Sequence, residues 1–150
     1  MARSYFSTVL DHSADDVWAA IRAFDAYHWA VPDSHTVIEG GKRGDQDSAV
    51  RHVTMGERVI RQKLLAHSDV ERSYTYAFAD RIPFPVRDYV ATIRVTPVIE
   101  TGEAFVEWWA TFDCLDAAEV DKWTRYFERD GFATWLAALR AFMERKRKAA

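Results

Sequence analysis

Hydrophobic and polar positions alternate through the middle of the chain and change to helical spacing near its two ends. Alternation with a period of about two residues is typical of strands and predicts seven of them. Their expected ranges are 4–10, 35–39, 48–55, 58–67, 73–79, 88–96 and 104–114. Very short connections, such as the one at residues 55–57, join neighbouring strands and indicate an antiparallel sheet.

Two short helices are expected between the first and second strands. Ser13 suits the N-cap of the first, because its hydroxyl can accept a backbone N–H bond, and Asp15 and Asp16 favour the positive end of the helix dipole. The second is expected over residues 26–30. Pro32 should end it, because proline lacks the backbone N–H group that a helix needs.

Residues 116–148 have the spacing of one long amphipathic helix. Asp116 is its expected N-cap, and Glu119 follows at the capping-box position. Gly131 costs about 0.5–1 kcal/mol relative to alanine, which a bend or a close approach to a neighbour would offset. The stripe expected to face the sheet comprises Val120, Trp123, Phe127, Trp135, Leu139 and Phe142, flanked by Phe132, Leu136 and Met143.

The size and composition indicate one domain over residues 1–150 with a single core. Hydrophobic residues make up 49% of the chain and aromatic residues 14%, including six Trp, nine Phe and six Tyr. Aromatic rings are large and rigid, so these side chains can fill a core or line a pocket.

Charge and cysteine content favour a cytoplasmic protein. The net charge of -3 and the pI of 5.9 give no reason to expect nucleic-acid binding, and the basic segment 145–148 is interpreted as a solvated helix end. Cys114 is the only cysteine, so no disulfide forms within the chain. No apolar run approaches the ~20 residues that span a bilayer. We therefore expect no integral membrane association, and either a monomer or a homodimer.

Alternation also separates an apolar face of the sheet from a mixed face. The apolar face carries Tyr74, Tyr76, Phe78, Tyr89, Ala91, Ile93, Val95, Val106, Trp108, Ala110 and Phe112. The mixed face includes Phe105 and Trp109. Because the apolar face bears several phenolic hydroxyls and lies opposite the long helix, we expect a cavity between them.

Several short segments, taken in order, are similar to those of a known family. They are Ser13-Ala14-Asp15-Asp16-Val17-Trp18, Trp29-Ala30-Val31-Pro32, Ala49-Val50-Arg51, Lys63-Leu64-Leu65-Ala66, Tyr74-Thr75-Tyr76, Pro85 with Asp88-Tyr89, and Trp108 with Phe112. With them, about residues 3–145 resemble the START-like (SRPBCC) superfamily. That group includes polyketide cyclase/dehydrase and lipid transport-like proteins, the birch pollen allergen and the plant abscisic acid receptors.

The resemblance implies an α+β helix-grip fold, in which a seven-stranded antiparallel sheet wraps around a long C-terminal helix, with two short helices after the first strand. It also implies a cavity for hydrophobic or amphipathic small molecules. Two departures from the family pattern matter. Met55-Gly56-Glu57 replaces the longer gate loop of receptor-like relatives, and Gln62 stands where a glutamate is frequent. A neutral amide cannot act as a general acid or base.

Arg51 has two open interpretations: facing the cavity, it could hold a carboxylate or an enolate, and facing outward, it would pair with a surface acid. Gln62, Tyr76 and Tyr89 could hydrogen-bond to a ligand, whereas Trp108 is expected mainly to fill space. The candidate ligand-binding residues are Arg51, Val53, Gln62, Leu64, Tyr76, Tyr89, Ala91, Trp108, Phe112, Phe127 and Trp135.

No motif for a metal, a cofactor or a catalytic group stands out. The five histidines lack metal-binding spacing, and Cys114 has no neighbouring His or Lys that would activate it. The chain also has no phosphate-binding glycine loop and no nucleophile elbow. We therefore assign no metal, no cofactor and no catalytic residue, and leave open whether a reaction is catalysed.

Three functions remain open. The first is binding of a hydrophobic or aromatic small molecule in the internal cavity. The second is a polyketide cyclase/dehydratase-type enzyme that acts by confinement and enolate stabilisation. The third is a protein-interaction module with a filled core, for which outward-facing Phe105 and Trp109 would supply the contact surface.

Overall fold

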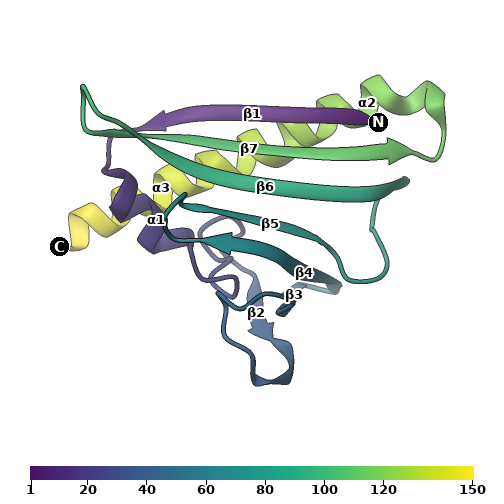
Figure 1. Cartoon of the computed structure of the whole chain (residues 1–150), viewed down its shortest axis with the longest axis horizontal. Coiled ribbons are helices and arrows are strands. Elements are labelled where there is room, and N and C mark those ends of the chain that lie inside the picture. Colours follow the sequence, from purple (N-terminus) through teal and green to yellow (C-terminus); the bar gives the residue numbers. More distant parts are fainter.

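The computed structural model describes residues 1–150 as one antiparallel sheet with helices against its concave face (Figure 1). The strands are β1 (Ala2–Leu10), β2 (His35–Ile38), β3 (Val50–Met55), β4 (Arg58–Ser68), β5 (Ser73–Phe78), β6 (Val86–Val98) and β7 (Glu103–Cys114). The α-helices are α1 (Ala14–Ile21), α2 (Val120–Tyr126) and α3 (Thr134–Ala149), with short 3-10 turns at Glu39–Gly41 and Ala117–Glu119.

The strands follow the order β1-β7-β6-β5-β4-β3-β2, and every neighbouring pair is antiparallel. β2 to β7 form a meander, whereas β1 pairs with β7 and so brings the start of the chain beside the last strand (Figure 1). The seven predicted strands are confirmed, and their boundaries move by two residues or fewer.

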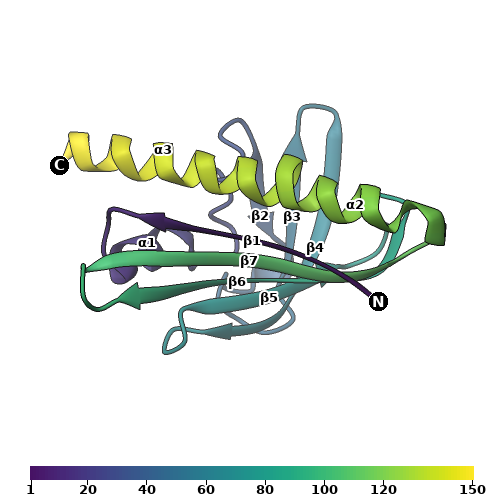
Figure 2. The same cartoon turned by 90° about the horizontal axis from the view of Figure 1, so that it is seen from above.

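Two bulges bend the sheet. The register of β6 shifts between Arg87 and Val90, where Asp88 has a φ of 54°, and the register of β4 shifts between Leu64 and Ala66. A bulge adds a residue to one strand and increases its bend. Figure 2 shows the result: β2, β3 and β4 run at a steep angle to β6 and β7, so the sheet curls around the C-terminal helices.

Residues 117–149 form a continuous C-terminal rod along the concave face (Figure 2). Between α2 and α3, residues Phe127–Ala133 are π-helical and include Gly131, so the predicted single helix contains a change of helix type. Asp116 caps the rod as predicted, accepting from the Ala118 N–H group at 2.9 Å. The capping-box prediction is wrong, because Glu119 accepts from Trp123 Nε1 at 3.1 Å and pairs with Lys122 instead.

The π-helical segment changes which side chains the rod buries. Hydrogen bonds in a π-helix join residues five positions apart, and the buried stripe steps by that spacing from Phe127 to Phe132. It continues through Leu136, Leu139 and Met143, whereas Trp135 and Phe142 are only partly buried. Three residues predicted to flank the stripe, Phe132, Leu136 and Met143, are therefore in its buried centre. Trp135 and Phe142, which were predicted at the centre, lie at its edge. No helix, the rod included, is apolar over enough length to cross a membrane.

The second short helix predicted at residues 26–30 is wrong. This segment forms turns, closed by bonds from the N–H groups of Ala30 and Val31 to the Tyr27 carbonyl at 3.0 and 3.1 Å. The turns allow Tyr27 and Trp29 both to be buried, and Pro32 has no N–H group with which to extend a helix.

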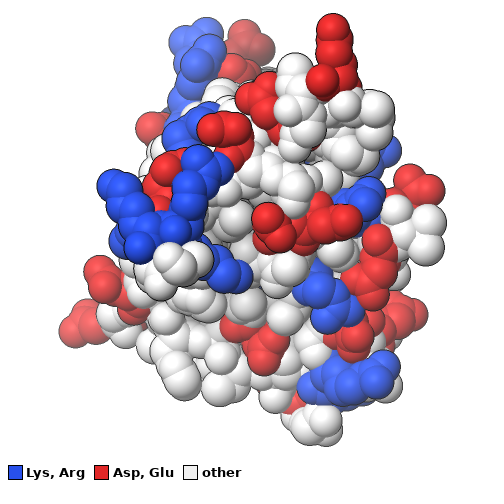
Figure 3. Space-filling model, turned by 90° about the vertical axis from the view of Figure 1, so that its left-hand side faces the viewer, with Lys and Arg blue, Asp and Glu red and all other residues white.

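Polar contacts fasten the end of α3 to the chain around the end of β1. Arg140 Nη2 donates to Thr8 Oγ1 at 2.8 Å, and His12 Nε2 lies 3.0 Å from Glu144 Oε1. Arg147 Nη2 donates to the backbone carbonyl of Asp11. The basic helix end is thus partly engaged by the protein. Figure 3, which views this end of the molecule, shows basic and acidic side chains interspersed over the surface.

α1 is capped by Ser13 as predicted, whose Oγ accepts from the Asp16 N–H group at 3.1 Å. The turn between β4 and β5 holds the other end of this helix. Asp69 Oδ1 accepts from Arg22 Nε at 2.9 Å and from Trp18 Nε1 at 2.8 Å. These two hydrogen bonds, that of Arg22 above all, lower the pKa of Asp69 to about 2.

We predict that Asp69→Asn lowers the free energy of unfolding at neutral pH by about 1 kcal/mol, because charge-assisted bonds to Arg22 become neutral ones. The effect stays small because the Asp69 side chain is 58% exposed and solvent screens it. Since the folded-state pKa lies below the ordinary 3.8, the stabilisation exists above that pH and is lost as the pH falls towards 2. Urea unfolding of both proteins at neutral and acidic pH measures this.

The matched control is Asp33→Asn, at an exposed aspartate for which the structure records no ion pair. Equal destabilisation by both substitutions, or a wild-type advantage that persists in acid, would contradict the role of Asp69.

Candidate functional site

An internal pocket opens between the C-terminal rod and the curled part of the sheet. Its volume is about 260 Å³, and ten of its 14 lining residues are hydrophobic. The lining residues are Tyr27, Val31, Met55, Arg58, Ile60, Gln62, Tyr76, Phe78, Pro83, Phe84, Tyr89, Tyr126, Asp130 and Trp135.

Segments far apart in the sequence supply the wall. The turns after α1, the hairpin of β3 and β4, strands β5 and β6, and the loop before β6 meet the rod there. The bulge at Asp88 aims Tyr89 inward, so its ring centre lies 5.1 Å from that of Phe127. The π-helical segment lets Asp130 and Trp135, five positions apart, both reach the pocket.

Three buried phenols give the apolar pocket a polar component. Tyr27, Tyr76 and Tyr89 are all buried, and desolvation is the main cause of their altered ionisation. Burial raises the pKa of Tyr27 to about 12 and holds the pKa of Tyr76 and Tyr89 above the ordinary 10. The three hydroxyls therefore stay protonated at physiological pH.

Arg51 on β3 points inward and is 0% exposed, so the outward interpretation is wrong. Its Nε donates to Gln62 Oε1 at 2.8 Å, and its Nη1 donates to the Phe24 carbonyl at 3.2 Å. The guanidinium carbon lies 4.0 Å from the centre of the Phe24 ring and 4.2 Å from that of Tyr27. No acidic side chain pairs with it, and it sits one layer behind the pocket wall that Gln62 and Tyr27 form.

The pocket brings together four of the candidates identified from the sequence: Gln62, Tyr76, Tyr89 and Trp135. The other candidates do not line it. Val53, Leu64, Ala91, Trp108, Phe112 and Phe127 are buried in the core behind the wall, as Arg51 is. Alternation in the strands identified the inward face correctly, but it could not distinguish residues that line the pocket from residues packed in the core.

Trp108 fills the space between the middle of β7 and the rod. It is 0% exposed, its ring centre lies 5.3 Å from that of Phe132 and 5.2 Å from that of Trp135, and its Nε1 donates to the Tyr76 hydroxyl at 3.2 Å. The rod and the sheet are in contact there, and the pocket occupies only the region nearer the β3–β4 hairpin.

Sequence reasoning missed most of the remaining pocket residues. They are Tyr27, Val31, Met55, Arg58, Ile60, Pro83, Phe84, Tyr126 and Asp130. Most lie in turns, in the hairpin or on the rod, where strand alternation carries no signal. A search for aromatic residues beside the prolines of the 82–85 loop would have found Phe84. Phe78, which was assigned to the apolar face, also lines the pocket.

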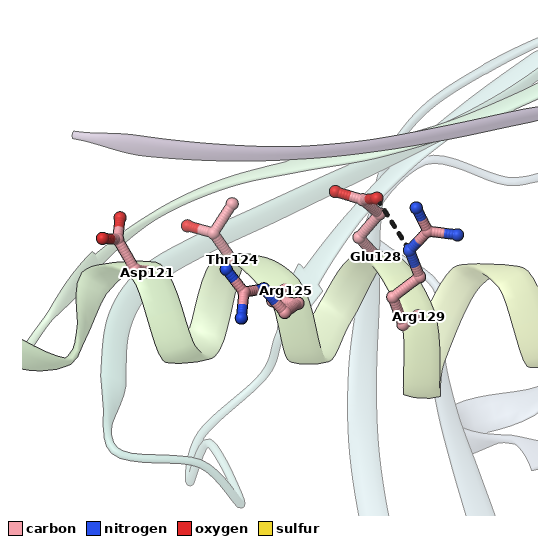
Figure 4. A pocket seen from close by; sticks show the side chains of 5 residues that line it. All are labelled: Asp121, Thr124, Arg125, Glu128 and Arg129. Atoms are coloured by element: carbon pink, nitrogen blue, oxygen red, sulfur yellow. Dashed lines mark ion pairs between the residues drawn. The ribbon is translucent and has the colours of Figure 1, made fainter.

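A second hollow lies on the outer surface of the rod, with a volume of about 360 Å³ (Figure 4). All five of its lining residues are polar or charged: Asp121, Thr124, Arg125, Glu128 and Arg129. Glu128 and Arg129 already pair with each other at 3.0 Å. Open, solvated and without an apolar wall, this hollow suits an organic ligand less well than the internal pocket does.

The chain is similar to a known protein family and to several solved structures. The sequence profile described as polyketide cyclase / dehydrase and lipid transport matches residues 1–150. No curated protein sequence matches the chain. Among solved structures, the chain is similar to XoxI from Bacillus cereus, at 28% identity and a TM-score of 0.79, with 97% of this chain and 99% of that chain covered.

Two more distant structures support the fold alone. The di-domain ARO/CYC protein BexL has 16% identity and a TM-score of 0.77, with 96% of this chain and 47% of that chain covered. A norcoclaurine synthase point mutant from Thalictrum flavum, solved with a transition-state analogue, has 15% identity and a TM-score of 0.72, with 96% of this chain and 95% of that chain covered. The helix-grip fold predicted from the sequence is confirmed, and the chain belongs to the polyketide cyclase/dehydrase and lipid transport family.

Proposed function

We propose that this protein binds a small, largely apolar molecule in the pocket between the C-terminal rod and the sheet. The observation that supports this most directly is the lining: ten hydrophobic residues surround the pocket, with the polar groups of Gln62, Tyr76 and Tyr89 at separate points of the wall. Apolar burial would supply affinity, and the few polar groups would orient the ligand.

The size of the pocket limits the ligand. A volume of about 260 Å³ lies below the roughly 300–1,000 Å³ typical of sites for drug-sized molecules. We infer a ligand with one or two rings or a short chain. Arg58 and Asp130 are exposed and line the mouth, so a polar end of the ligand would project there.

A cyclase/dehydratase-type enzyme is the second candidate, and the family to which the chain belongs favours it. The phenols and Gln62 could donate to an enolate oxygen, and the closed wall could hold a substrate in a folded conformation. Asp130, at the mouth, is the only carboxylate that lines the pocket, and no histidine does. The raised pKa values keep the phenols protonated, so they can donate hydrogen bonds but cannot take up a proton. We therefore rank binding above catalysis.

The third candidate, a protein-interaction module, depends on the outer face of the sheet. Trp109 is partly exposed there, but Tyr5 stacks on it with ring centres 6.5 Å apart. The guanidinium carbons of Arg3 and Arg94 lie 5.8 and 5.5 Å from the centre of the Trp109 ring. Side chains of the protein itself thus cover part of this surface, and we rank this function last.

We predict that Ile60→Trp abolishes ligand binding, because the larger side chain would occupy the pocket. Isothermal titration with 2-naphthol, a two-ring probe with one hydroxyl group, should show affinity weakened by at least about tenfold. The matched control is Val59→Trp, the adjacent residue of β4, which is 51% exposed and does not line the pocket. Its affinity should stay close to that of the wild type. Equal loss in both variants, or no binding of apolar probes by the wild type, would count against the pocket as a binding site.

We also predict that stability falls as the pH rises from 10 to 12. The unfolded chain loses phenolic protons at the ordinary pKa of 10, whereas Tyr27 keeps its proton to about 12. The folded state therefore binds more protons in this window, and the stabilisation present below pH 10 is lost as the pH approaches the folded-state value.

Urea unfolding at several pH values measures this slope. Tyr27→Phe should make it less steep, and Tyr126→Phe, at a partly buried ring, is the control. Stability that is constant or rises between pH 10 and 12 would show that these phenols are not shielded from water.

A further inference from the structure

The hydrogen bond between Arg51 and Gln62 fixes which way the Gln62 amide faces. A guanidinium group only donates hydrogen bonds, so the amide atom 2.8 Å from Arg51 Nε must be the oxygen, Oε1. The amide nitrogen, Nε2, therefore faces away from Arg51.

Arg51 cannot easily release that oxygen. Its guanidinium lies between aromatic rings, with its carbon 4.0 Å from the centre of Phe24 and 4.2 Å from that of Tyr27. Its Nη1 also donates to the Phe24 carbonyl at 3.2 Å. Because no acidic side chain neutralises the buried cation, the amide oxygen of Gln62 is its main polar partner on the β4 side. An alternative amide rotamer would leave Arg51 Nε buried without a partner.

The pocket consequently meets the donor end of Gln62. Gln62 lines the pocket, and its Nε2 has no hydrogen-bond partner, yet it is not among the fully buried polar atoms that lack one. The phenols of Tyr76 and Tyr89 add a second donor. Tyr76 accepts from Trp108 Nε1 at 3.2 Å and donates toward the Tyr89 oxygen, which leaves the O–H bond of Tyr89 at the end of this chain. The polar groups deep in the pocket therefore offer hydrogen atoms.

We propose that the ligand carries a carbonyl oxygen that accepts a hydrogen bond from Gln62 Nε2, with Arg51 as the positioning residue that keeps this N–H group turned to the pocket. The proposal rests on the binding function proposed above and narrows its ligand to carbonyl compounds with an apolar body. A carbonyl oxygen only accepts, so it matches this site. A hydroxyl group can also accept from Nε2, but its own hydrogen then needs an acceptor, and Arg51 already uses one lone pair of Gln62 Oε1.

Three probes of one skeleton test this: benzylacetone, the alcohol formed by reducing its ketone, and butylbenzene. Isothermal titration of the wild-type protein should show benzylacetone binding about tenfold more tightly than butylbenzene, with the alcohol in between. Infrared spectra of carbonyl-labelled benzylacetone should show the C=O stretch at lower frequency when bound than in an apolar solvent. That shift reports a hydrogen bond directly and does not depend on affinity.

Gln62→Glu is the decisive variant, because it conserves shape and removes the donor. A glutamate held by Arg51 would present only acceptor oxygens, so the preference should reverse, with the alcohol binding more tightly than the ketone. Gln46→Glu, at the only other glutamine of the chain and on an exposed loop, is the matched control and should keep the wild-type order. Arg51→Met should let the amide rotate, so the preference for the ketone should shrink to about twofold or less.

The possible results distinguish the carbonyl proposal from the binding function on which it rests. A ketone preference that reverses in Gln62→Glu supports the proposal. Equal binding of all three probes by the wild type would overturn it and leave the proposed binding function standing, whereas failure of all three to bind would contradict that function itself. Circular dichroism checks that each variant folds. If Arg51→Met does not fold, the Gln62→Glu titrations and the infrared shift still decide.

Discussion

The structure depends on the packing of one helical rod against the concave face of a strongly bent sheet. Over the middle of β7 the rings of Trp108, Phe132 and Trp135 are in contact, with ring centres 5.2 to 6.0 Å apart. Bulges in β4 and β6 turn the remaining strands away from that contact. The pocket is the space that results where the sheet curls and the rod cannot follow it.

A buried cation organises the wall of that space. Taking Arg51 out of water without an acidic partner is costly, and three kinds of contact offset the cost: the Gln62 amide oxygen, the Phe24 carbonyl and the faces of the Phe24 and Tyr27 rings. These partners lie on β4 and in the turns after α1. One side chain on β3 therefore connects the turns after α1 to the sheet, which strand pairing alone would not do.

Burial and the Arg51 contact also determine which hydrogen-bonding groups the pocket offers. Burial keeps the phenols protonated, and Arg51 occupies the acceptor end of Gln62, so hydrogen-bond donors predominate in the interior. A site of this kind favours an oxygen that only accepts, as in a bound ketone, and it would also stabilise charge that develops on such an oxygen. The same hydrogen-bond donors would therefore serve binding and catalysis in this pocket. What separates them is a group able to take up a proton, and the interior of the pocket contains no carboxylate and no histidine.

The sequence by itself determined the antiparallel sheet, the inward face of its last strands, the capped first helix and the long C-terminal helix, because each depends on local periodicity or on a side chain beside its own backbone. It also placed Gln62, Tyr76 and Tyr89 on the inward face, which follows from strand alternation once that face is known. Only the tertiary structure decided that residues 26–30 form turns, because Tyr27 and Trp29 are buried by distant partners. It also decided that Arg51 faces inward but stays behind the wall, and that Phe84 and Asp130 reach the pocket. These outcomes depend on how far the bulged strands bend and on how the π-helical segment rotates the buried face of the rod. Both features couple residues far apart in the chain, so they leave no periodic signal in the sequence.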